Sequence, residues 1–105
     1  MTKFLVTYHG GAEPTPESAP AMMAAFGEWM TQHEAVVVDG GAPVIPAGQV
    51  ATGDAEPLAS IGGYSILEGS EVDVQAALQA HPFVARGGTL QLNVALDPSQ
   101  PPPQR

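Results

Sequence analysis

The stretch "IGGYSILEGSEVDVQAALQAHP", residues 61–82, decides the fold because it places a strand directly before a helix whose start is well defined. Residues 61–68 are rich in aromatic and β-branched residues between glycines, which predicts a strand. Ser70 and Asp73 have the spacing of a capping box, with Ser70 as the N-cap. We therefore predict a helix that begins after Ser70 and runs to about Ala80.

The end of this helix raises the question of why a histidine lies there. Val74, Ala77 and Leu78 share one helix face, and three residues beyond Leu78 the same stripe reaches His81. The histidine is therefore predicted to turn inward. Pro82 cannot continue the helix and disfavours helical geometry in the residue before it, so His81 lies at a sharp exit.

Three further strands and one helix are predicted outside this stretch. A strand at residues 3–8 ends in glycines, and a helix at 19–33 begins after Ser18, with apolar residues at helical spacing. "AVVVDGGAPV", residues 35–44, predicts a second strand that is stopped by the glycines and proline. The last strand, 89–96, alternates leucine and valine with polar residues. Residues 43–60 are predicted as a long loop, with room for a short strand at 49–52.

The resulting order, βαββαβ, predicts an α+β, ferredoxin-like fold: one antiparallel sheet with both helices on one face. The last strand gives the other face Gln91 and Asn93. The first strand gives it either Leu5 and Thr7 or Phe4 and Val6, and this mixture is too apolar to be left exposed to water. We therefore expect a homodimer, a dimeric α+β barrel, with a partly polar cavity between the two sheets. Residues 1–97 form this domain, and 98–105 are expected to be a disordered, proline-rich tail.

Composition restricts the class of partner. With 105 residues, 44% of them apolar and 13% charged, the chain suits a single globular domain. The net charge of −8 repels nucleic acid and anionic membranes, so neither is an expected partner. There is no cysteine, which excludes disulfides, zinc fingers and iron–sulfur clusters. No apolar run is long enough for a membrane span, and the first residues lack the features of a secretory signal, so a cytoplasmic location is expected.

Two histidines and one aspartate are the candidate catalytic residues. Asp39 ends the second strand, and if it approaches a histidine it would raise the pKa of that imidazole and produce a general base. His81 is one candidate for this base, and His9, which follows the first strand and precedes two glycines, is the other. Each has a structural alternative: a helix-end cap for His81, an exposed turn for His9 and a turn-forming aspartate for Asp39. His33 ranks behind them, since the helix dipole explains it.

Four other side chains are candidates for substrate binding. Tyr8, Trp29 and Tyr64 would form the walls of the cavity, although packing in the core or the dimer interface explains them equally well. Arg86 would hold an anionic substrate, with a solvated loop arginine as the alternative. The histidines and Asp39 lack the spacing of a metal site, and there is no phosphate-binding loop or nucleophilic serine elbow, so no metal or cofactor is expected.

Taken together, several segments resemble the YCII-related family, whose members are also described as DGPF-type proteins. They are "FLVTYHG" (4–10), "FGEWM" (26–30), "VVVDGGAP" (36–43), "GGYSILEGSEVDVQAALQAHPFVARGG" (62–88) and "TLQLNVAL" (89–96). The resemblance implies the dimeric α+β barrel and the histidine–aspartate acid–base catalysis proposed for a family largely without established activities. The DGPF motif itself is absent, and its nearest counterpart is "DGGAP" (39–43).

Two hypotheses of different class follow. The first is a small dimeric enzyme that performs acid–base chemistry of lyase, isomerase or dehydrohalogenase type on a small organic molecule. The second is a non-catalytic module that binds a small molecule or supports another protein, in which the same residues only pack.

Overall fold

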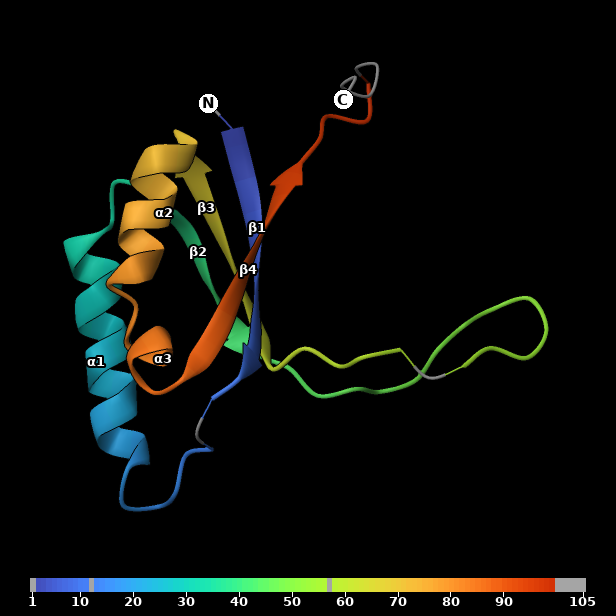
Figure 1. The fold of residues 1–105 in the computed structure, drawn as a ribbon, viewed down its shortest axis with the longest axis horizontal. Helices are drawn as coiled ribbons and strands as arrows, with labels where there is room; N and C mark the ends of the chain where they lie inside the picture. The colour runs from blue at the N-terminus through green and yellow to red at the C-terminus, as the bar shows by residue number, and fades with distance from the viewer. Residues whose placement is uncertain (1, 12, 57, 100–105) are drawn as a thin grey trace.

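A four-stranded antiparallel sheet with its helices gathered on one face forms the body of the protein (Figure 1). The computed structural model describes residues 2–11, 13–56 and 58–99. Their elements follow the order β1 (Thr2–Gly10), α1 (Ala19–Gln32), β2 (Val37–Pro43), β3 (Gly63–Gly69), α2 (Glu71–Gln79), α3 (Pro82–Ala85) and β4 (Gly88–Ala95). The strands lie in the order β2-β3-β1-β4, so the predicted βαββαβ arrangement is confirmed, with one short helix added.

The register of β1 sorts the sheet into two faces. Phe4 and Val6 pair with Val94 and Leu92 of β4, and all four point toward the helices. Leu5 pairs with Asn93 on one side and with Ile66 on the other, on the face without helices. We call this second face the bare face.

The core lies between the sheet and the helices. Its buried members are Phe4, Val6, Trp29, Leu67, Val74, Ala77 and Leu78. On α2 the buried positions are those that the periodicity of the sequence predicts, whereas on α1 Trp29 is buried and Met23, which belongs to the predicted stripe, is 74% exposed. The Ser70 hydroxyl accepts a hydrogen bond from the Asp73 amide at 3.1 Å, as the capping box requires. His81 is 2% exposed, so its predicted inward orientation is confirmed.

Strand β2 differs from its prediction because it runs through the glycines that were expected to stop it. Gly41 has φ of 74°, and a Cβ there would lie 1.7 Å from the Tyr64 carbonyl oxygen. The glycine is therefore needed for close approach of two backbones, and the register of β2 against β3 shifts on both sides of Asp39. Glycine lets the bulged strand continue through this position, whereas the sequence pattern had predicted that the strand ends there.

Two other regions also differ from the sequence prediction. Helix α3 was not predicted, because four residues are too few to show a helical period. The suggested short strand at residues 49–52 is absent, and the chain from 44 to 62 instead projects from the sheet as a long excursion (Figure 1). Of the predicted tail, residues 100–105 lie outside the described part of the chain.

Candidate functional site

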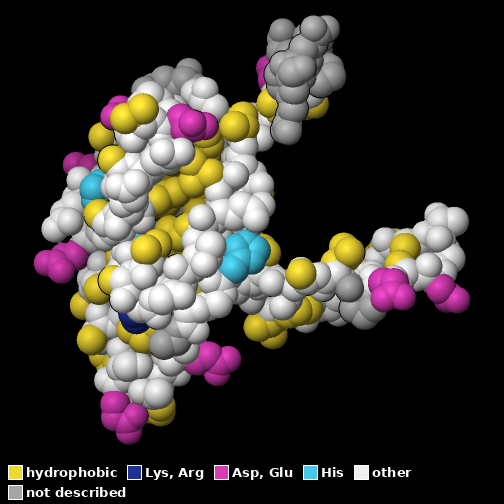
Figure 2. Space-filling model, viewed as in Figure 1, with side chains coloured by type: hydrophobic (Ala, Val, Ile, Leu, Met, Phe, Trp, Pro, Cys, Tyr) yellow, Lys and Arg dark blue, Asp and Glu magenta, His cyan; other side chains and the backbone are white. Residues whose placement is uncertain are grey.

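A pocket of about 520 Å³ opens on the helix side of the sheet, between the start of α1, α3 and the facing ends of β2 and β3. Its walls are mainly apolar and include Met22, Phe26, Pro82 and Phe83. This is the size and character of pockets that bind small molecules. A more open groove of about 400 Å³ between α2 and β4 is visible as a hollow in Figure 2, but the residues that line it carry no titratable side chain.

A chain of hydrogen bonds lies at the floor of the pocket. The hydroxyl of Tyr8 lies 2.8 Å from Nε2 of His81 and 2.7 Å from Oγ of Ser65. The Ser65 hydroxyl donates to the Gly40 carbonyl at 2.7 Å. At the other end, the backbone N–H of Phe83 donates to Nδ1 of His81 at 3.0 Å, so the imidazole caps the N-terminus of α3.

These contacts fix the protonation of His81. Because Nδ1 accepts from an amide, it carries no proton, and the neutral ring therefore has its proton on Nε2. Nε2–H then donates to the Tyr8 oxygen, and the Tyr8 O–H donates to Ser65. Burial, followed by the charges of Arg86 and His33, lowers the pKa of His81 to about 4. His81 is thus a neutral hydrogen-bond donor with no free lone pair.

Among the residues joined by these hydrogen bonds, Tyr8 is the one that β1 contributes to the wall of the pocket. Burial raises the pKa of its phenol, and the hydrogen bond with Ser65 partly opposes that rise. At neutral pH the group is therefore a phenol, able to donate a proton or a hydrogen bond. The His81 ring contacts it edge-on, with ring centroids 5.2 Å apart, and so fixes its orientation.

Arg86 contributes positive charge to the pocket. Its guanidinium carbon lies 5.9 Å from the centroid of the Phe83 ring. Its Nε is buried and has no hydrogen-bond partner among the described residues. A buried donor without a partner is costly, and because this Nε is out of reach of solvent, an anion in the pocket would meet the outer part of the guanidinium group.

The sequence-predicted site residues therefore divide into two groups. Tyr8, His81 and Arg86 border the pocket, which lies on the helix side of the sheet and not between two sheets as expected. Tyr64 also borders it from β3, but its register with Thr7 puts its side chain on the bare face beside Ile66. Trp29 lies behind His81, with ring centroids 4.3 Å apart, and its Nε1–H donates to the Ala77 carbonyl at 2.7 Å in the core.

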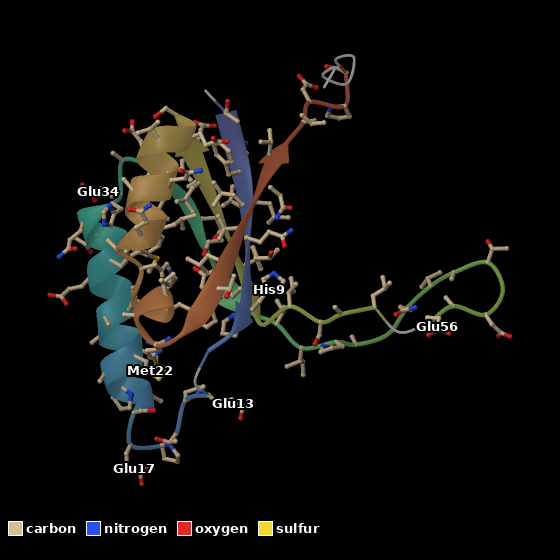
Figure 3. The ribbon with its side chains drawn as sticks, viewed as in Figure 1. His9, Glu13, Glu17, Met22, Glu34 and Glu56 are labelled. Carbon is tan, nitrogen blue, oxygen red and sulfur yellow. The ribbon has the colours of Figure 1, made fainter. Side chains whose placement is uncertain are left out.

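His9 and Asp39 lie away from the pocket. Figure 3 places His9 on the side of the sheet opposite the helices, where its Nε2 is 2.8 Å from the Thr7 hydroxyl. Asp39 is exposed, and its Oδ1 accepts a hydrogen bond from the Gly41 amide at 2.8 Å. It is in register with Ile66, about 13 Å along the sheet from the level of His9 and two strands across. Within one copy of the chain, Asp39 therefore makes no described hydrogen bond to either histidine.

Sequence reasoning missed Ser65 and the position of Tyr8 beside His81. One signal for Ser65 was available: it occupies the strand face shared with Leu67, where a hydroxyl must find a partner if it is buried. The contact between Tyr8 and His81 joins residues from opposite ends of the chain, which local patterns cannot reveal.

The described part of the chain has neither a cluster of metal-ligating side chains nor a helix that could span a membrane. No three histidine, aspartate or glutamate side chains come together there in a way that could hold a metal ion. No helix among these residues is long and apolar enough to cross a membrane.

Among solved structures, the fold is similar to that of 5-chloro-2-hydroxyhydroquinone dehydrochlorinase from Burkholderia phenoliruptrix AC1100, determined in complex with 2,5-dihydroxybenzoquinone. The two chains are 20% identical, with a TM-score of 0.51 over 85% of this chain and 90% of the other. No protein-family model and no curated protein sequence matches this chain. At this level of identity the likeness supports the ferredoxin-like α+β fold.

Proposed function

We propose that the chain is a YCII-related, small-molecule enzyme that binds a small oxygen-bearing organic anion in the pocket and transfers a proton to it. One observation carries the proposal: an apolar pocket has Tyr8, oriented by His81, at its floor and the positively charged side chain of Arg86 on its wall. A largely apolar cavity with a few convergent polar groups is typical of an active site.

The roles follow from the protonation states. Tyr8 acts as the acid: its O–H turns from Ser65 to the bound substrate anion, the O–H bond breaks, the proton passes to the carbon that carries the leaving group, and a phenolate remains. The phenolate then takes the proton of a substrate hydroxyl as the carbon–chlorine bond breaks and chloride leaves, which restores the phenol. The Nε2–H of His81 already points at the Tyr8 oxygen, and the Ser65 hydroxyl can turn from the Gly40 carbonyl to donate to it as well. His81 is then a positioning residue that acts through Tyr8, and Arg86 holds the negative charge of the substrate.

The structural neighbour supports the choice of substrate class. It is a dehydrochlorinase that binds 2,5-dihydroxybenzoquinone, a planar ring with several oxygens. Such a ring suits the aromatic walls of Phe26 and Phe83, and its acidic hydroxyls suit Arg86. A proton-transfer step of the lyase or dehydrohalogenase type is the corresponding reaction.

Calorimetric titration with 2,5-dihydroxybenzoquinone tests the pocket directly. Arg86→Met keeps the length of the side chain and removes its charge, so we expect binding to weaken by roughly tenfold or more. Val72→Ser, an exposed change on α2, is the matched control and should bind as wild type. No binding by the wild type, or equal binding by Arg86→Met, would overturn the pocket assignment.

Chloride release from 5-chloro-2-hydroxyhydroquinone tests the chemistry. Tyr8→Phe should still bind the quinone but lose turnover by on the order of 10²-fold, because the proton donor is gone. A wild type that binds without turnover would favour the second function, a small-molecule-binding module. That alternative has a specific basis in the structure, since neither nitrogen of His81 has a lone pair free to act as a base.

We also propose a homodimer joined through the bare face. Leu5, which is 40% exposed, and the part-exposed Ile66 lie beside each other at its centre. In such a dimer His9 and Asp39 would face the partner's sheet, where a histidine–aspartate pair could form between copies. His9→Ala tests this arrangement. If His9→Ala loses turnover while Tyr8→Phe keeps it, the reaction takes place at the bare face and not in the pocket. A monomer at micromolar concentration in light scattering would contradict the dimer.

A further inference from the structure

A long projection joins β2 to β3, and we call its described residues, 44–56 and 58–62, the arm. Figure 1 shows the arm leaving the sheet on the side away from the helices. At its base, the Val44 amide donates to the Gly62 carbonyl at 3.1 Å. Further out, the Gln49 side chain donates to the Glu56 carbonyl at 3.1 Å and accepts from the Leu58 amide at 2.9 Å. These bonds tie the outgoing and returning halves together, so the arm is an organised element.

The arm exposes apolar side chains that none of the described residues covers. Ile45 is 87% exposed, Val50 104% and Leu58 78%. Figure 2 shows hydrophobic side chains along the arm and acidic ones near its far end. Burial of a side chain of this size stabilises a protein by roughly 1.5–3 kcal/mol, so an interaction partner is the physical reason for such a composition.

The direction of the arm points to a second copy of this chain as that partner. The arm and the bare face are on the same side of the sheet, so a copy that covers the bare face must also lie beside the arm. A two-fold axis then makes both contacts reciprocal, and each arm passes the other copy. A different protein would need two separate complementary surfaces, one for the arm and one for the bare face, because no two-fold axis would relate the two contacts.

The length of the arm fixes where the contact falls. From residue 44 to the turn near Gly53, an extended chain covers roughly 30 Å, whereas packed sheets lie only about 10 Å apart. Val50 and Leu58 therefore extend beyond the gap between the sheets. Ile45, near the base, remains at the level of the gap.

From these observations we propose that the arm is a clasp: in the homodimer, Val50 and Leu58 of each copy are buried against the flank of the other. This inference rests on the proposed homodimer and adds to it an element that the barrel interface does not require. The acid–base chemistry of the pocket is independent of it.

A photo-crosslink tests the clasp directly, and the absence of cysteine from the chain makes the labelling site unique. Val50→Cys is labelled with benzophenone maleimide and mixed with unlabelled, isotopically heavy protein before irradiation. We expect light–heavy crosslinked dimers, with the attachment sites on the flank of the heavy copy. Val72→Cys, on α2 and 77% exposed, is the matched control and should give few crosslinks. Crosslinks confined within the labelled chain would overturn the clasp.

Sedimentation equilibrium separates the clasp from the dimer. The double variant Val50→Ser, Leu58→Ser should raise the dissociation constant of the dimer by roughly tenfold or more, whereas Val72→Ser should leave it unchanged. Circular dichroism of the double variant should match the wild type, since both positions are exposed. A wild-type dimer that the double variant does not weaken overturns the clasp and leaves the dimer standing. A monomeric wild type overturns both and leaves quinone binding untouched.

Discussion

His81 lies where α2 ends and α3 begins, and its two ring nitrogens have different tasks. Nδ1 caps α3 through the Phe83 amide, and Nε2 donates to Tyr8. Both bonds need the neutral ring with its proton on Nε2. A proton added to Nδ1 would remove the cap of α3 and place a charge beside the Arg86 guanidinium.

The stability of the protein should therefore fall in mild acid. The unfolded chain binds a proton at this histidine near pH 6.5, and the folded chain only near pH 4. The contribution of neutral His81 is thus complete above pH 6.5 and is lost as the pH falls toward 4, by on the order of 3 kcal/mol. Urea unfolding at several pH values measures it.

His81→Asn is the control for that experiment, because asparagine keeps an N-cap acceptor and does not titrate. The free energy of unfolding of the variant should depend less steeply on pH than that of the wild type. The titration of the acidic residues is common to both proteins and does not contribute to the difference. Identical slopes in the two proteins would contradict the assignment of His81 as the acid-sensitive group.

Sequence patterns predicted the inward turn of His81 but not its hydrogen-bond partner, and they named Arg86 only as one candidate, with a solvated loop arginine as the alternative. The helical stripe of α2 fixes the direction of residue 81, since spacing along one helix determines its face. The contact with Tyr8 depends on how β1 and α3 come together in three dimensions. The expected pairing with Asp39 depended on its place at a strand end, where binding groups are common, and Asp39 instead lies in a bulged, exposed segment and bonds the Gly41 amide.

At the scale of elements, β2 depends on a glycine with left-handed backbone geometry. Gly41→Ala should cost about 3 kcal/mol or prevent folding, because a Cβ there would collide with the Tyr64 carbonyl oxygen. Gly10→Ala is the matched control: its φ of 71° carries the same backbone strain, but its Cβ would meet open space, so about 1 kcal/mol is expected. Urea denaturation compares them, and equal losses would argue against the steric explanation.

Helix α2 depends on its capping residue. Ser70→Ala removes the acceptor of the Asp73 amide and should lower the free energy of unfolding by about 1 kcal/mol. Ser70→Asn restores an acceptor and should recover most of that loss. Thermal melting of the three proteins checks the order, and a Ser70→Ala variant as stable as wild type would contradict the role of the cap.

The elements that the sequence predicted well are those whose residues repeat with a period. Strand β4 alternates over its full length, and α1 and α2 place their apolar residues at helical spacing. The arm and α3 have no such period. The arm is held by side chain-to-backbone bonds of Gln49, and α3 is too short to show a pattern.

At the scale of the whole molecule, charge acts against the proposed dimer. Each copy carries a net charge of −8, so two copies repel each other at low ionic strength. Salt shortens the range of that repulsion, and the dimer should therefore become tighter between roughly 0.02 M and 0.5 M sodium chloride. Sedimentation equilibrium measures the change. A dimer that weakens with salt would indicate that ion pairs, rather than apolar contacts, join the copies.

The hydrogen-bonded chain from Phe83 through His81, Tyr8 and Ser65 to Gly40 ties α3 to three strands of the sheet. A single helical turn has almost no stability of its own. Joined in this way, α3 cannot open locally without breaking bonds that belong to the core. The Phe83 amide should accordingly exchange with deuterium as slowly as the central strands, and this wall of the pocket should keep its shape whether the pocket is empty or filled.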